Sequence, residues 1–211
     1  MNIEDSAYKQ LQDLYNTVKS SLKHPMEFYP VNIELILRQN GWVIHEVDGL
    51  GIFKDGQIPI GKSDLASKEI SINVNMAESR KRFTLAHELG HIVLHGHLCN
   101  THYRHSNSKR PAMADHTTQI MTQKTRHEEL EAQRFAASIL MPSKAVQAHF
   151  FTLFNRNSIR LASTPNKSIE EELKEICTFE DNENKSLSDF FEVSLQAMII
   201  RLKNLRLVIC T

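Results

Sequence analysis

A five-residue motif, HELGH at residues 87–91, constrains this chain more than any other feature of its sequence. His87 and His91 are one helical turn apart, so on a helix their side chains lie on the same face. Two imidazoles in this arrangement can direct ring nitrogens at one cation about 2.0–2.1 Å away. Glu88 points beside the pair, where a carboxylate can take a proton from water. The motif therefore predicts two metal ligands and one general base.

We expect the motif to lie on a helix from about Glu78 to His95, ended by Gly96 in a left-handed conformation. Within this helix, a glycine at position 90 makes the free energy of helix formation about 1 kcal/mol less favourable than an alanine would. A glycine at such a position indicates that another backbone passes close to it. The alternative is a polar helix that faces solvent and binds no metal.

A second helix, within the segment HEELEAQRFAASILMP, offers a third ligand and ends at the proline. On it, Glu129 shares one face with Ala132 and Ala136 at helical spacing. The two alanines would let this helix pack tightly on the first, near Gly90, and this geometry aims Glu129 at the metal. Glu131 points about 200° around the helix from Glu129. We therefore predict Glu129 as the third ligand. The alternatives are Glu131, Glu128, His127, Asp115 and the other histidines of residues 97–127.

Three short, β-branched segments bounded by Gly, Asp, Asn and Ser predict a small sheet. They are WVIHEV (42–47), GIF (51–53) and EISINVN (69–75). In the last of these, Ile70, Ile72 and Val74 alternate with polar residues, as in a half-exposed or edge strand. Residues 97–127 are polar, rich in histidine and without a clear period, which favours a long surface loop.

Most of the remaining chain favours helices, so the sequence as a whole predicts an α+β protein. We expect helices over residues 3–22, over 33–39 after an Asn32 cap, and over 143–155. A further helix should begin at a capping box of Ser168 and Glu171. Two more should lie on either side of a turn at Glu192–Val193, and Ser194 should cap the second of them. The segment at residues 159–168 is typical of a linker.

Composition and charge exclude several classes of protein. The 25 basic and 25 acidic residues cancel, so no global positive field favours nucleic acid. No apolar run approaches the roughly 20 residues that span a bilayer, and the N-terminus lacks the apolar core of a signal peptide. We therefore expect a cytoplasmic protein. Its three cysteines are far apart and form no CxxC pair, which disfavours a cysteine-based zinc site.

The pattern at the C-terminus, a short helix, a turn and a longer helix, could read DNA. Its second helix carries Arg201, Lys203 and Arg206. Three basic residues are few for a binding mode that depends on many phosphate contacts. The pattern therefore favours packing against the rest of the chain, or docking of a protein substrate, over DNA binding.

RFTLAHELGHIVLHG (82–96), followed by ELEAQRFAASILMP (129–142), resembles the paired motifs of the ImmA/IrrE-type metallopeptidases. ISINVN (70–75) and FFEVSLQAMIIRLKNLRLV (190–208) also resemble flanking segments of that family. The resemblance covers roughly residues 35–151 and 186–208. It implies a zincin-like α+β metallopeptidase domain over residues 1–150, with an insertion at 97–127, and a helical C-terminal region over 151–211.

The same resemblance implies a cytoplasmic zinc endopeptidase, with manganese as an alternative metal. His87, His91 and Glu129 would be the ligands, and Glu88 the catalytic base. The implied substrate is a transcriptional repressor of the helix-turn-helix class. The alternative function is that of a regulatory or toxin–antitoxin-type protein that binds a partner or DNA without cutting it.

Two further features of the implied site are a strand beside the cleft and a group that stabilises the tetrahedral intermediate. The SINVN strand would flank the cleft, where an extended substrate could add to it by main-chain hydrogen bonds. The alternative is that this strand only bounds the sheet. The group that stabilises the tetrahedral intermediate could be His95 or one of the loop residues His102, Tyr103 and His105. His95 could instead cap the C-terminus of its helix as a cation. Cys99 is a further alternative metal ligand.

Overall fold

The computed structural model describes residues 2–22, 25–50, 59–96, 103–106, 116–162 and 167–210. The chain divides into two compact units, one of Met1–Val18 with Asn32–Ile139 and one of Lys19–Val31 with Leu140–Thr211. The predicted domain boundary after residue 150 stays a prediction. The second compact unit contains α5, which spans Ser143–Phe154.

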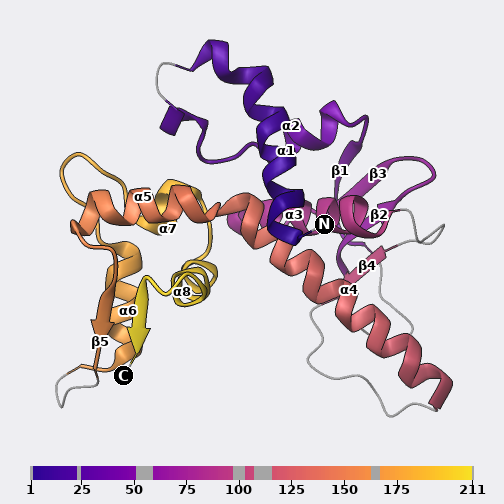
Figure 1. The fold of residues 1–211 in the computed structure, drawn as a ribbon. Coiled ribbons are helices and arrows are strands. Elements are labelled where there is room, and N and C mark those ends of the chain that lie inside the picture. The colour runs from indigo at the N-terminus through magenta and orange to yellow at the C-terminus, as the bar shows by residue number, and fades with distance from the viewer. Residues whose placement is uncertain are drawn as a thin grey trace. The chain divides into compact units, whose positions relative to one another are not determined.

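The first unit combines a small sheet with helices, in agreement with the predicted α+β class (Figure 1). Its elements are α1 (Ile3–Val18), α2 (Ile33–Gln39), β1 (Val43–Val47), β2 (Pro59–Asp64), β3 (Glu69–Asn73), α3 (Glu78–His95), β4 (Tyr103–Ser106) and α4 (His116–Leu140). The predicted helices near the N-terminus are confirmed, and Asn32 caps α2 by accepting a hydrogen bond from the N–H of Leu35 at 2.9 Å.

The sheet is mixed, with the strand order β1-β3-β2-β4. β1 runs parallel to β3, whereas β2 is antiparallel to both β3 and β4. The strand expected at residues 69–75 is therefore β3, which lies between β1 and β2. Of the two predicted alternatives, the half-exposed strand is confirmed and the edge strand was wrong. The neighbour that covers it, β2, contains Pro59 and Gly61 and gives no apolar alternation from which to predict a strand. The expected strand at 51–53 lies outside the described residues.

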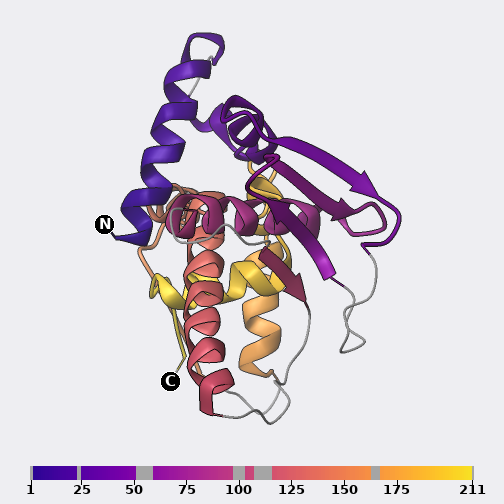
Figure 2. The ribbon, with the colours of Figure 1, turned by 90° about the vertical axis from the view of Figure 1, so that its right-hand side faces the viewer.

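Burial in β3 follows the alternation that the sequence predicts. Ile70 and Ile72 are 0% and 1% exposed, whereas Val74, beyond the end of the strand, is 40% exposed. Figure 2 shows α3 lying along one face of the sheet, where it contacts β2 and β3. Leu85 and Leu89 of α3 are also buried, and each such side chain contributes about 1.5–3 kcal/mol to folding. This packing fixes the helix that carries HELGH against the sheet.

Part of the segment expected to be a loop, residues 97–127, has regular structure. Tyr103–Ser106 form β4, and α4 begins at His116. The loop prediction was wrong there because HTTQIMTQKTR, residues 116–126, carries too few apolar side chains to show a helical period. Gly96 was also mispredicted, since its φ of −57° and ψ of −21° are right-handed.

The second unit is mainly helical (Figure 1). Its elements are η1 (Lys19–Ser21), η2 (Pro25–Phe28), α5, β5 (Ile159–Leu161), α6 (Ile169–Thr178), α7 (Leu187–Phe191), α8 (Leu195–Asn204) and β6 (Val208–Cys210). β5 pairs in parallel with β6, so the segment expected to be a linker at residues 159–168 begins as a strand. None of the helices formed by the described residues has the length and apolar character of a membrane span.

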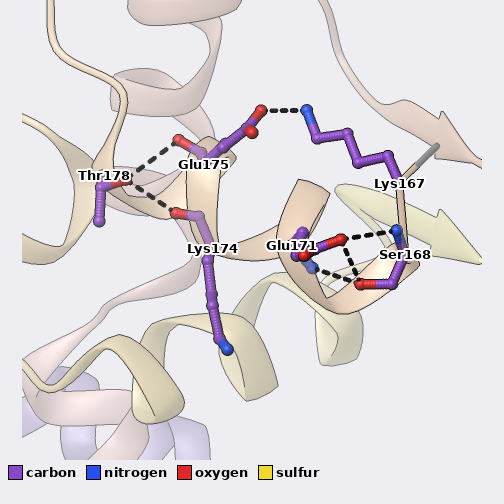
Figure 3. Close-up of polar contacts among 6 residues, drawn as sticks. All are labelled: Lys167, Ser168, Glu171, Lys174, Glu175 and Thr178. Carbon is purple, nitrogen blue, oxygen red and sulfur yellow. Dashed lines mark hydrogen bonds and ion pairs between the residues drawn. The ribbon is translucent and has the colours of Figure 1, made fainter.

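Side-chain caps begin α6 and α8 where the sequence predicts them. At α6, Ser168 Oγ accepts from the N–H of Glu171 at 3.2 Å, and the Glu171 carboxylate accepts from the Ser168 N–H at 2.9 Å (Figure 3). Figure 3 also shows Lys167 paired with Glu175 beside the same helix. Ser194 caps α8 after a turn at the expected position. The predicted capping box and turn are therefore confirmed.

His149 of α5 is a buried titratable side chain in the second unit. Its ring stacks on Phe190 with centroids 4.0 Å apart, and its Nε2–H donates to the carbonyl oxygen of Lys185 at 2.8 Å. Burial lowers the pKa of His149 below its ordinary 6.5, although the Lys185 carbonyl and Asp181 act in the opposite direction. The folded chain therefore binds a proton at this imidazole only at lower pH than the unfolded chain does.

We predict that the second unit loses stability as the pH falls below about 6.5, because protonation then favours the unfolded chain. Calorimetric unfolding near pH 7.5 and near pH 5 measures the effect in the wild type and in His149→Gln, which keeps a donor for the Lys185 carbonyl. The loss of Tm should be smaller in the variant. An equal loss in both proteins would assign the acid sensitivity to other groups.

Candidate metal centre

The three side chains predicted as metal ligands converge between α3 and α4. His87 Nε2 and His91 Nε2 lie 3.0 Å apart, and the two carboxylate oxygens of Glu129 lie 3.2 Å and 3.3 Å from them. His87 and His91 are 0% and 1% exposed, while Glu129 is partly exposed. The histidine pair of α3 and the carboxylate of α4 thus form one cluster that could hold a metal ion.

Close packing at Gly90 allows this convergence. A Cβ on Gly90 would lie 3.1 Å from both the Cα and the backbone oxygen of Ala132, and 3.2 Å from Phe135 Cδ1. α4 crosses α3 at this contact, as Figure 2 shows. Because Glu129 lies one turn before Ala132, contact at Ala132 carries the Glu129 carboxylate to the histidine pair. The predicted close approach of another backbone to Gly90 is confirmed.

The donor set and its spacing fit a divalent cation. Donors about 2.0–2.1 Å from a tetrahedral metal lie roughly 3.3 Å from one another, close to the three distances of this cluster. Hydrogen bonds alone satisfy the cluster less well. An ionised Glu129 carboxylate only accepts hydrogen bonds, so the Nε2 atom of each imidazole would have to carry a hydrogen and donate to it. The two Nε2–H groups would then face one another across 3.0 Å. A cation among the three lone pairs removes that repulsion.

Glu88 lies on α3 between the two histidines in sequence, and its carboxylate is bound by the sheet. Ser63 Oγ of β2 donates to Glu88 Oε2 at 2.6 Å, and both residues are 0% exposed. Ser63 was not among the predicted site residues. The signal that could have found it is Gly61-x-Ser63, two small residues on one face of a strand, which indicates close packing on another element.

Glu131, the main alternative ligand, has different partners. Its Oε2 lies 3.6 Å from His95 Nε2 and 3.2 Å from His127 Nδ1. Burial, and secondarily the nearby His91, lower the pKa of His95 below its ordinary 6.5. A neutral imidazole disfavours the role of a cationic cap at the end of α3. The role of His95 toward a tetrahedral intermediate stays a prediction.

Other candidates from the sequence fall outside the described part of the chain. Cys99, His102 and Asp115 are among those residues. Tyr103 and His105 belong to β4, of which the structure describes the backbone but not these side chains. Within the described residues, the cluster close enough to share an ion consists of His87, His91 and Glu129.

The sheet, the helix pair and the buried cluster together define an α+β protein of the metallopeptidase type. The family profile described as IrrE N-terminal-like domain matches residues 51–203, which include both α3 and α4. The chain belongs to this family, the ImmA/IrrE metallopeptidases, so the resemblance noted in the paired motifs is confirmed. A search of curated proteins found no match. The matched region extends through most of the second compact unit as well as the first.

Gly90→Ala should weaken zinc binding by about 10- to 100-fold, a loss typical of disturbed support for a ligand. The added methyl group meets backbone atoms of Ala132 and moves α4, with Glu129, away from the histidines. In a helix with no neighbour packed against it, the same change would stabilise the helix by about 1 kcal/mol. Isothermal titration with zinc measures the affinity, with the exposed Arg134→Ala on α4 as the control. Unchanged affinity in Gly90→Ala would contradict the account of how Glu129 is placed.

Proposed function

We propose that this protein is a metal-dependent endopeptidase that hydrolyses a peptide bond in a transcriptional repressor of the helix-turn-helix class. The observation that supports this most directly is the cluster of His87, His91 and Glu129 next to the buried Glu88. Three protein ligands leave a coordination position for water, whereas structural zinc sites are usually closed by four. The repressor as substrate is supported by the family to which the chain belongs.

Zinc is the cofactor that the proposal assigns. Two imidazoles and one carboxylate are a ligand set of catalytic zinc sites, and manganese also accepts these donors. Once bound, the ion supplies Lewis acidity, which lowers the pKa of a water molecule and polarises a carbonyl group.

The chain's own residues would position the reaction and move its proton. His87 and His91, fixed on one face of α3, and Glu129 from α4 would hold the ion. The Glu88 carboxylate would accept a proton from the attacking water and pass it to the nitrogen of the leaving amine. Because Glu88 is 0% exposed, the protein rather than bulk solvent sets the direction of this transfer.

The basic residues of α8 and the turn after it favour a peptidase over a DNA-binding protein. Arg201 is buried, and its Nε–H donates to the carbonyl oxygen of Met141 at 2.9 Å. That leaves Lys203 and Arg206 as the exposed members of the basic trio. Two cations supply little of the phosphate contact on which DNA affinity depends.

Glu88→Gln should retain the metal and lose cleavage by roughly 100- to 10,000-fold, the usual contribution of a general acid–base group. The assay incubates the zinc-loaded protein with the purified product of the adjacent gene as the candidate repressor, and follows fragments by mass spectrometry. Elemental analysis of the same samples reports the bound zinc.

Two controls make the outcome decisive. Glu180→Gln, a change at an exposed carboxylate outside the cluster, should cut at the wild-type rate. A chelator should stop cleavage, and added zinc should restore it. Native-rate cleavage by Glu88→Gln would refute the mechanism, and a stable complex without fragments would favour a protein that binds its partner without cutting it.

A further inference from the structure

We infer that Ser63 is a positioning residue for Glu88, and that β2 is placed by Gly61 so that Ser63 can hold the Glu88 carboxylate in one direction. This inference deepens the proposed function and rests on it, since it names the residue that orients the proposed catalytic base. Ser63 belongs to the sheet, whereas the other proposed site residues belong to α3 and α4.

The hydrogen bond from Ser63 to Glu88 is short and shielded from water. Ser63 Oγ donates to Glu88 Oε2 at 2.6 Å, and both side chains are 0% exposed. Hydrogen bonds to a carboxylate are shorter and roughly twice as strong as those between neutral groups. Rotation of the carboxylate about its last side-chain bond would break this contact. The hydroxyl therefore fixes the orientation of the carboxylate as well as its position.

Gly61 brings β2 close enough to α3 for this bond to form. Alternate residues of a strand face the same side of a sheet, so Gly61 and Ser63 both face α3. A Cβ on Gly61 would lie 2.6 Å from Thr84 Cγ2 and 3.3 Å from Glu88 Oε1. Thr84 and Glu88 are one helical turn apart, and together they form the surface on which β2 lies. A side chain at position 61 would displace β2, and Ser63 with it.

The direction of a general base is part of its chemistry, because it must lie within hydrogen-bond reach of the proton that it takes. A misplacement of about 1 Å can cost on the order of 100-fold in rate. Loss of the Ser63 hydroxyl would remove this restraint on the Glu88 carboxylate while leaving His87 and His91 in place. The effect should therefore fall on kcat, with KM and metal content retained.

The first test is Ser63→Ala in the full-length, zinc-loaded protein, with repressor cleavage as the assay. We expect kcat to fall by about 10- to 100-fold, with KM and bound zinc unchanged. Ser6→Ala is the matched control, because Ser6 is another buried serine of the first unit and its hydroxyl donates to the backbone oxygen of Asn2. In a Glu88→Gln background, Ser63→Ala should cause no further loss, since the base through which it acts is gone.

The second test needs no turnover. In metal-free protein, Ser63→Ala should lower Tm by about 2–6 °C in the wild-type background. The same substitution should lower Tm less in a Glu88→Ala background, because the acceptor is already absent. This double-mutant cycle measures the bond itself and separates it from the proposed peptidase activity.

Gly61→Ala offers an independent route to the same displacement. It should reduce kcat as Ser63→Ala does, and Thr84→Ser, which removes Cγ2, should restore part of the loss. If Ser63→Ala does not fold, Ser63→Cys takes its place, since a thiol keeps the shape of the side chain but is a weaker donor.

A fall in kcat that disappears in the Glu88→Gln background, together with coupled Tm losses, supports the inference. Unchanged kcat in Ser63→Ala, or equal Tm losses with and without Glu88, overturns it. A wild-type chain that cuts nothing under saturating zinc overturns the proposed function instead, and the unfolding cycle alone then decides whether Ser63 holds Glu88.

Discussion

Contact between α3 and α4 at Gly90 is the constraint on which the candidate centre depends. The histidine pair of α3 supplies two donors by helical spacing alone, but the third donor comes from another helix and needs a close crossing. Gly90 and Ala132 allow that crossing, because a single Cβ on Gly90 would lie 3.1 Å from backbone atoms of α4. The carboxylate of Glu129 then lies 3.2–3.3 Å from both imidazole nitrogens.

The sheet contributes a second constraint, on the proposed base rather than on the ligands. β2 packs on α3 through Gly61, and Ser63 donates to the buried Glu88 carboxylate. Ligands and base are therefore supported from two sides of the same helix by different elements. A helix fixed in this way presents its side chains with little freedom, and such fixed geometry is what positioned chemistry requires.

Local signals in the sequence predicted much of this arrangement. The spacing of His87 and His91 and the caps of α2, α6 and α8 depend on residues a few positions apart, so they could be read directly. The prediction of Glu129 as a ligand needed one further step, which was to pack the small residues of one helix against those of the other. Strand pairing is not local. The sequence left an edge position open for β3, because its partner β2 has no apolar alternation from which to predict it. The role of Ser63 was hidden for the same reason.

X-ray absorption at the zinc edge of the metal-loaded protein tests the central claim most directly. The account predicts one zinc per chain, with imidazole nitrogen and carboxylate oxygen at about 2.0–2.1 Å and no sulfur in the coordination shell. Loss of the imidazole signal in a His87→Ala, His91→Ala double variant would complete that result. A sulfur shell at about 2.3 Å, or zinc bound unchanged without the two histidines, would contradict it.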